Sequence, residues 1–210
     1  NLDVTFAIDR AGLVGADGST HSGNYDIAYL RCIPNIVGMT PSNEKETRLM
    51  LTTAYEYKGP ASVRYPRGSG PNVQVSDNLE SLEIGKANII REGSDKVIFL
   101  NFGSLLHEAI TVSEALDLTL IDMRFVKPLD KEILIKYLTT AELFVSLEDG
   151  SIAGGAGSCV QEFCSEENIV IKSKLLGIPD IFIEHASREE MIKDAGLTAI
   201  QIEKTLLPLM

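Results

Sequence analysis

The sequence has few cysteines, fewer basic than acidic residues, and no long apolar run. Its three cysteines fit no metal-ligand spacing, so we expect reduced thiols packed as small apolar groups and no metal site. The formal net charge of −11 disfavours nucleic acid and anionic membrane surfaces as partners. No segment has the length of a membrane-spanning helix or the pattern of a signal peptide. These properties predict a cytoplasmic protein.

The rest of the composition is that of a globular domain, with 44% hydrophobic and 23% charged residues in 210. The first residue, Asn1, is not an initiator methionine, and an apolar strand pattern begins within three residues. We therefore expect the chain to be the C-terminal part of a longer protein.

Residues 1–68 alternate between strand and helix patterns, which predicts an α/β unit with parallel strand pairing. The run at 4–8 resembles a buried strand because Val4, Phe6, Ala7 and Ile8 are apolar. Further strands are predicted at 36–40 and 62–65, and helices at 26–32 and 43–57.

Residues 69–82 lose this periodicity and are rich in turn-forming residues, so we interpret them as a linker. Residues 83–210 then form a second α/β unit with a mainly parallel sheet. Ser187 and Glu190 form a capping-box pattern at the start of one of its helices. The predicted strands are 84–91, 97–101, 118–122, 143–147 and 169–175, and the predicted helices are 105–116, 131–138, 156–164, 188–194 and 198–209.

The segment from Gly15 to His21 is the strongest candidate for chemistry. It follows a predicted strand, where α/β sheets place their ligands, and its glycines allow a sharp bend. Asp17 offers an acceptor, and His21 offers a side chain that exchanges protons near neutral pH. The alternative is a glycine-rich turn with a capping Asp or Thr and an incidental histidine.

Arg10 and Arg67 each follow a predicted strand, so both are expected at one edge of a parallel sheet. A guanidinium group matches phosphate in a bidentate manner, which predicts a phosphate site despite the acidic net charge. The alternative is that Arg10 pairs with Asp9 or Asp17 and that Arg67 is a solvated strand end. Arg64, earlier in the same segment, is a lesser candidate.

Other polar segments are better explained by structure than by catalysis. The glycine-rich turn at 154–158, after Glu148 and Asp149, matches neither phosphate-binding nor dinucleotide-binding patterns, and we expect it to pack at a domain or subunit contact. We expect His107 to face solvent early in a helix and His185 to be a polar loop residue. The charged run from Asp122 to Asp130 favours solvated or interdomain salt bridges.

Several short sequence motifs, in order and with compatible spacing, closely resemble those of the 1-deoxy-D-xylulose-5-phosphate synthase family of transketolase-type thiamine-diphosphate enzymes. The resemblance covers essentially the whole chain, although Ser19 and Asn24 differ from the wider transketolase motif. The matching motifs are at residues 7–12, 15–21, 29–34, 39–42, 63–68, 101–103, 122–130 and 154–158.

This resemblance implies part of a doubly wound pyrimidine-binding domain followed by a transketolase C-terminal-type α/β domain. It implies that His21 and Asp17 act on the substrate and that Arg10 and Arg67 bind its phosphate. The substrates would be pyruvate and glyceraldehyde 3-phosphate, in a homodimer located in the cytoplasm or, in a plant, the plastid stroma.

The resemblance also implies thiamine diphosphate and Mg²⁺ in the full-length enzyme, with their main binding elements before this chain begins. Which residues of this chain touch the cofactor stays unknown, and we expect the chain to be inactive alone. Two alternatives remain: part of another transketolase-type enzyme, or a non-enzymatic C-terminal dimerisation module.

Overall fold

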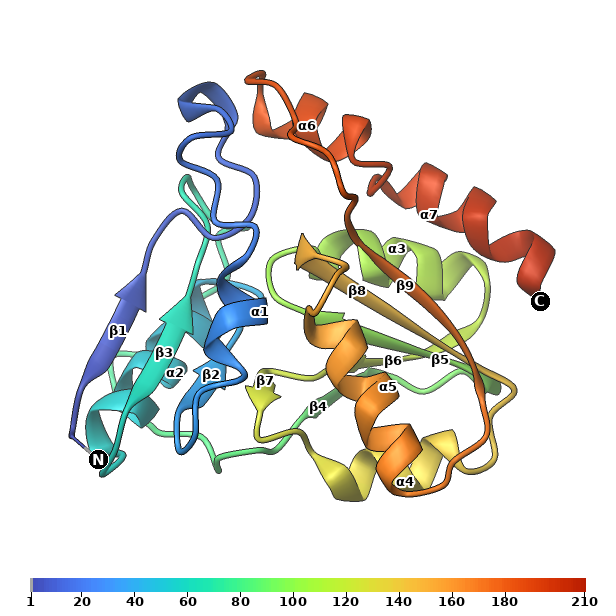
Figure 1. Cartoon of the computed structure of the whole chain (residues 1–210), viewed down its shortest axis with the longest axis horizontal. Coiled ribbons are helices and arrows are strands. Elements are labelled where there is room, and N and C mark those ends of the chain that lie inside the picture. The colour runs from blue at the N-terminus through green and yellow to red at the C-terminus, as the bar shows by residue number, and fades with distance from the viewer. Residues whose placement is uncertain (1) are drawn as a thin grey trace.

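The computed structural model describes residues 2–210 as two α/β units that lie side by side (Figure 1). The sheet of the N-terminal unit has the strand order β1-β3-β2-β7. β3 pairs in parallel with both β1 and β2, as predicted, whereas β7 is antiparallel to β2. The elements are β1 (Thr5–Ile8), α1 (Asp26–Leu30), β2 (Val37–Met39), α2 (Glu44–Glu56), β3 (Ala61–Arg64) and, from later in the chain, β7 (Phe125–Lys127).

The long helix of this unit, α2, follows the predicted pattern closely. Asn43 caps it, because its side chain accepts a hydrogen bond from the Glu46 amide at 3.0 Å. Met50 and Ala54 lie one turn apart on the buried face and pack against the central strand residue Val63. The helix thus covers one face of the N-terminal sheet.

The prediction of a buried first strand was wrong. The side chains of β1 are mostly exposed, with Phe6 47% accessible. β1 is the edge strand of its sheet and pairs on one side only, with β3, so its apolar residues are incompletely covered by the described part of the chain.

The C-terminal unit has a sheet of order β4-β6-β5-β8-β9, parallel except for the antiparallel edge strand β4. Its strands are β4 (Asn88–Arg91), β5 (Ser94–Phe102), β6 (Leu118–Asp122), β8 (Leu143–Ser151) and β9 (Lys172–Ile178). Its helices are α3 (Leu106–Ala115), α4 (Lys131–Leu138), α5 (Ala156–Glu166), α6 (Arg188–Asp194) and α7 (Ala199–Leu206), followed by the 3₁₀ turn Leu207–Leu209. The mainly parallel sheet of this unit is as predicted.

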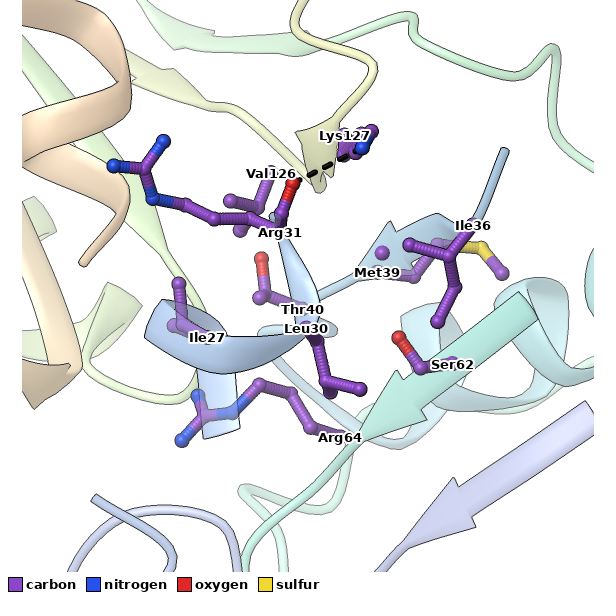
Figure 2. Close-up of a pocket in the computed structure, with 11 residues that line it drawn as sticks. Ile27, Leu30, Arg31, Ile36, Met39, Thr40, Ser62, Arg64, Val126 and Lys127 are labelled. Atoms are coloured by element: carbon purple, nitrogen blue, oxygen red, sulfur yellow. Dashed lines mark hydrogen bonds between the residues drawn. The ribbon is translucent and has the colours of Figure 1, made fainter. Parts of the chain in front are cut away.

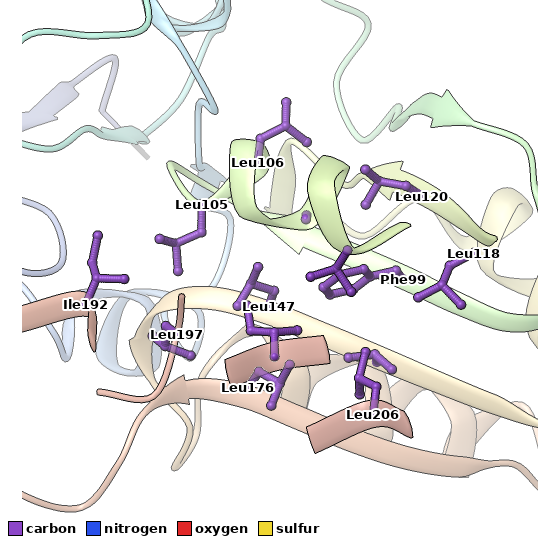
Figure 3. Packing of buried hydrophobic residues seen from close by; sticks show 14 of the residues in the cluster. Phe99, Leu105, Leu106, Leu118, Leu120, Leu147, Leu176, Ile192, Leu197 and Leu206 are labelled. Atoms are coloured by element: carbon purple, nitrogen blue, oxygen red, sulfur yellow. The ribbon is translucent and has the colours of Figure 1, made fainter. Parts of the chain in front are cut away.

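Helices cover both faces of this sheet. α3, α6 and α7 enclose one core, in which Phe99 packs against Leu147 and Leu206 (Figure 3). α4 and α5 enclose the other, around Phe144 and Phe163. The predicted capping box at Ser187 and Glu190 is present at the start of α6. β4 is shorter than predicted, β8 is longer, and β9 lies three residues later in the sequence.

Each unit inserts a side chain into the core of the other. Phe125 of β7 is fully buried in the core beneath the N-terminal sheet, with Met39 and Met50. Ile27 of α1 is buried in the core between α4, α5 and the C-terminal sheet. The connection at residues 69–82 contains no helix or strand, so these buried contacts, rather than the connection, hold the units together.

Candidate functional site

A loop from Arg10 to Gly23, here called the glycine loop, leaves β1 and carries most of the predicted site residues. Its two ends are tied together, because the Gly12 amide donates to the Gly23 carbonyl and the Gly23 amide donates to the carbonyls of Arg10 and Gly12. Between these ends lies the 3₁₀ turn Gly15–Asp17. Arg10 adopts a left-handed backbone conformation (φ 59°), which is uncommon for a non-glycine residue and frequent at functional sites.

Arg10, Asp17 and Arg67 meet at the end of the N-terminal sheet. The Asp17 carboxylate accepts a hydrogen bond from Arg10 Nε at 3.0 Å and pairs with Arg67 Nη1 through the same oxygen. Arg10 Nη1 also donates to Asp9 at 2.9 Å. The predicted convergence of the two arginines is therefore present, and so is the ion pairing of Arg10 that the alternative prediction describes.

The two arginines of this cluster are paired with two carboxylates, Asp9 and Asp17, and keep part of their surface in solvent. Hydrogen bonds first from Arg67 and then from Arg10 lower the pKa of Asp17, so this carboxyl stays ionised and holds both guanidinium groups. The Arg10 and Arg67 side chains remain 37% and 52% exposed, which leaves N–H donors open to solvent. Two guanidinium groups with open N–H donors match the oxygens of a phosphate group.

His21 lies one turn beyond Asp17, where its amide donates to the Gly18 carbonyl. Its ring is exposed, and Nδ1 lies 3.0 Å from the Thr20 hydroxyl. The ring is therefore oriented by Thr20, while Asp17 is oriented by the two arginines. His107 is exposed early in α3, as predicted.

The C-terminal unit also contacts the glycine loop. A Cβ atom added to Gly18 would lie 3.1 Å from His185 Cβ, and one added to Gly15 would lie 3.5 Å from the Arg188 amide nitrogen. Sequence reasoning treated His185 as a polar loop residue and missed this position. No local pattern could have shown it, because the contact depends on the packing of the two units.

Arg64, the lesser candidate, lies away from solvent. Its side chain is 3% exposed and pairs with Asp26 and Asp149, one from each unit. It is therefore not available to a ligand in this structure.

The charged run forms contacts between the units, one of which is the interdomain salt bridge that we predicted. Arg124 pairs with Glu46 of α2 at 2.7 Å. Lys127 Nζ donates to the carbonyls of Arg31 and Ile33. Burial raises the pKa of Asp122 to about 7.

The glycine-rich turn packs between the units, as predicted. The Gly154 carbonyl accepts from Arg31 Nε at 2.6 Å, and the same guanidinium binds both carboxylate oxygens of Glu162. Glu148 accepts hydrogen bonds from the amides of Ala156 and Gly157, which occupies the N-terminus of α5 with a protein carboxyl rather than a ligand.

A small cavity lies between α1, β2, β3 and β7 (Figure 2). It holds about 20 Å³ of space for water-sized groups, enough for an ordered water and too little for a cofactor. Within residues 2–210 no three His, Cys, Asp or Glu side chains gather as metal ligands. The Arg10–Asp17–Arg67 cluster, outside this cavity, presents two guanidinium groups of the kind that bind a phosphate monoester. No helix in the described part of the chain has the length and apolarity to cross a membrane.

Comparisons with known proteins agree with this architecture. The chain is 56% identical over 203 residues to 1-deoxy-D-xylulose-5-phosphate synthase of Stutzerimonas stutzeri (strain A1501), covering 97% of this chain and 32% of that protein. It is 51% identical over 206 residues to the synthase of the same name from Bordetella avium (strain 197N), covering 98% of this chain and 33% of that protein. The chain thus spans about a third of the length of these relatives.

Among solved structures, the chain is similar to a protein described as "Split gene transketolase, inactive beta4 tetramer". The TM-score is 0.82 with 27% sequence identity, over 97% of this chain and 64% of that one. Residues 1–72 match the transketolase pyrimidine binding domain family, and residues 85–202 match the transketolase C-terminal domain family. The chain therefore belongs to the transketolase family.

Proposed function

We propose that this chain is part of an enzyme that condenses pyruvate with glyceraldehyde 3-phosphate, releasing carbon dioxide and forming 1-deoxy-D-xylulose 5-phosphate. The observation that carries the proposal is the convergence of Arg10, Asp17 and Arg67 beside the turn that holds His21. The name of the relatives at 50–56% identity supports the same reaction. That product would serve isoprenoid, thiamine and pyridoxal biosynthesis.

Arg10 and Arg67 bind the phosphate of glyceraldehyde 3-phosphate in this proposal. Both side chains are partly exposed and already share one carboxylate, so their free N–H groups lie close enough to engage one anion. Local cationic donors of this kind offset the repulsion that a chain of net charge −11 exerts on a phosphate.

His21 and Asp17 act at the carbon end of the same substrate. The aldehyde oxygen gains negative charge as the new carbon–carbon bond forms, and His21 donates a proton to that oxygen. Asp17, kept ionised by its arginines, accepts a hydrogen bond from a substrate hydroxyl. The two residues lie on successive turns of the glycine loop, which keeps the two functions close together.

Thiamine diphosphate supplies the chemistry that makes the carbonyl carbon of pyruvate nucleophilic. We place its diphosphate site, with Mg²⁺, mainly on residues outside this chain, since the chain spans about a third of the length of the synthase relatives. We propose that the full-length enzyme is a cytoplasmic homodimer and that this chain alone is inactive.

A second candidate is a dimerisation module without activity of its own, or the corresponding part of another transketolase-type enzyme. The structural neighbour described as an inactive β4 tetramer supports the first of these. The exposed apolar side chains of Phe6, Tyr25 and Tyr29 also support it.

The test is to replace Arg10 and Arg67 separately by alanine in the full-length enzyme. A charged hydrogen bond contributes about 1.5–3 kcal/mol, so each variant should raise the KM for glyceraldehyde 3-phosphate by about 10- to 150-fold. The KM for pyruvate should stay within about twofold, because pyruvate carries no phosphate.

The matched control is Arg91→Ala, which removes a partly exposed arginine paired with Asp117 at the far edge of the other sheet. It should change neither constant. Equal losses for both substrates in the Arg10→Ala and Arg67→Ala variants, or none, would rule out the phosphate site.

A further inference from the structure

Arg64 is a buried arginine that joins the two units. Its Nε donates to Asp26 at 2.6 Å, and its Nη1 pairs with Asp149 of β8. All three side chains are 3–5% exposed. A buried ion pair is weak support for stability, since apolar residues of similar volume often stabilise a protein as well or better. We therefore ask what these buried ion pairs hold in place.

The same guanidinium holds the base of the glycine loop. Arg64 Nη2 donates to the Gly23 carbonyl at 3.1 Å, and the Gly23 amide in turn donates to the Arg10 carbonyl at 3.0 Å. Only two hydrogen bonds thus separate Arg64 from the backbone of Arg10. Asp149 touches the loop as well, because a Cβ atom on Gly12 would lie 2.8 Å from its carbonyl oxygen.

A second set of hydrogen bonds, here called the second arm of the Arg64–Asp149 network, connects Asp149 to the Gly15–Asp17 turn of the glycine loop. The Asp149 carboxylate accepts from the Ser104 hydroxyl at 2.5 Å, and that hydroxyl accepts from Arg188 Nη2 at 2.8 Å. Arg188 begins α6, and its amide packs against Gly15, two residues before Asp17. Asp149 is therefore connected to both ends of the segment that carries Arg10 and Asp17.

We propose that Arg64 and Asp149 are positioning residues for the acceptor-phosphate site, and that the C-terminal unit takes part in acceptor recognition through them. Arg67 follows β3 directly, whereas Arg10 and Asp17 lie on the loop. The network fixes the loop relative to β3 and so sets the spacing of the two guanidinium groups. This inference rests on the proposed function.

The test uses Asp149→Asn and Ser104→Ala in the full-length enzyme, with phosphorylated and unphosphorylated glyceraldehyde as acceptors. Asp149→Asn keeps the side-chain shape and removes the charge that holds Arg64, and Ser104→Ala severs only the arm to Arg188. A misplacement near 1 Å can cost up to about a hundredfold, so we expect Asp149→Asn to raise the KM for glyceraldehyde 3-phosphate about tenfold or more. Ser104→Ala should raise it about threefold. In both variants kcat/KM for the unphosphorylated acceptor should fall less than for the phosphorylated one, because the unphosphorylated acceptor uses Asp17 and His21 but not the two guanidinium groups.

Glu46→Gln is the matched control, because it weakens the ion pair with Arg124, which also joins the two units but makes no contact with the glycine loop among the described hydrogen bonds. It should lower the thermal midpoint without changing the preference for the phosphorylated acceptor. The same shift of preference in Glu46→Gln as in Asp149→Asn would overturn the inference.

The inference is also overturned if both network variants lose activity equally on the two acceptors, or lose none. Ser104→Ala keeps the test decisive if Asp149→Asn fails to fold, since it leaves the Arg64 ion pairs intact. The outcomes separate the two proposals. Loss of phosphate preference in Arg10→Ala and Arg67→Ala, but not in the network variants, would leave the proposed function standing and reject the positioning role alone.

Discussion

Asp122 is a carboxyl group buried where the two units meet. It accepts hydrogen bonds from the Ser42 hydroxyl at 2.7 Å and the Asn101 amide at 3.2 Å, and it is 1% exposed. Burial, with the nearby Glu46 charge adding to it, raises its pKa to about 7 against the opposing effect of the Ser42 bond. The folded chain therefore holds a proton on Asp122 at pH values where the unfolded chain has lost it.

This difference in pKa determines how the free energy of unfolding changes with pH. Because the folded pKa lies above the unfolded one, the free energy of unfolding falls as pH rises from about 4 to 7 and levels off above that. Asp122→Asn introduces a neutral group of the same shape and removes this slope. At pH 8 the variant should gain stability relative to the parent by up to about 4 kcal/mol, and at pH 4 it should gain little.

Urea unfolding between pH 4 and pH 8 measures the effect. Glu148 is also raised to a pKa of about 7 by burial, so some slope should remain in the variant. Asp117→Asn, at a carboxylate that is 71% exposed, is the control and should leave the slope unchanged. Parallel pH profiles for the parent and Asp122→Asn would contradict the prediction.

The element that matters most for the site is the glycine loop, and Gly12 is the loop glycine that lies closest to the other unit. It has a φ of +69°, and a Cβ there would lie 2.8 Å from the Asp149 carbonyl oxygen and 3.0 Å from Asp149 Cβ. A side chain would thus meet both backbone strain and a clash with the other unit.

Gly12→Ala should therefore lower the free energy of unfolding by about 3 kcal/mol or more, combining strain with displacement of Asp149. Gly196→Ala is the matched control, because Gly196 has a φ of +76° but no atom within 4 Å of its Cβ position. It should lose only the conformational term, about 1–2 kcal/mol. Equal losses at the two positions, measured by urea unfolding, would show that the contact with Asp149 carries no weight.

Local patterns predicted most elements and failed where neighbours decide the outcome. α2 and α4 begin and end within a residue of the prediction. β7 was missed, because Phe125–Lys127 is a short segment within a charged run and becomes a strand only by pairing with β2. The exposure of β1 was missed because a sequence pattern does not show that a strand lies at an edge.

Part of the candidate site could be predicted from the sequence, and part could not. The convergence of Arg10 and Arg67 could be predicted, since residues that follow parallel strands share one edge of a sheet. The burial of Arg64 and the position of His185 beside Gly18 could not be predicted, because both depend on how the second unit packs against the first. The catalytic roles of His21 and Asp17 stay predictions.

At the scale of the whole molecule, the two units exchange buried side chains. Ile27 of the first lies in a core of the second, and Phe125 of the second is 0% exposed in the core of the first. Each core is therefore completed by the other unit. We expect the loss of either side chain to weaken chiefly the core that it enters.

Phe125→Ala tests this coupling. Removing a buried phenylalanine costs about 3–5 kcal/mol, and here the loss falls on the contact between the units. Native-state hydrogen exchange should show lowered protection of β2 and β3, while β5 and β8 keep theirs.

The control for this experiment is Phe163→Ala, which removes a phenylalanine of similar burial from the core between α5 and the C-terminal sheet. It should lower protection in β5 and β8. Loss of protection in the same strands for both variants would contradict a specific role of Phe125 in the N-terminal core.

The pairing of β7 with β2 also constrains how such chains can recombine. Although residues 69–82 contain no regular structure and look like a natural crossover point, β7 lies downstream of them and forms part of the upstream sheet. A chimera joined there would take β2 from one parent and its antiparallel partner β7 from the other. Phe125 would then pack into a core whose other residues come from a different protein. Gene shuffling between homologues should therefore succeed only when β2, β7 and the residues around Phe125 come from the same ancestor.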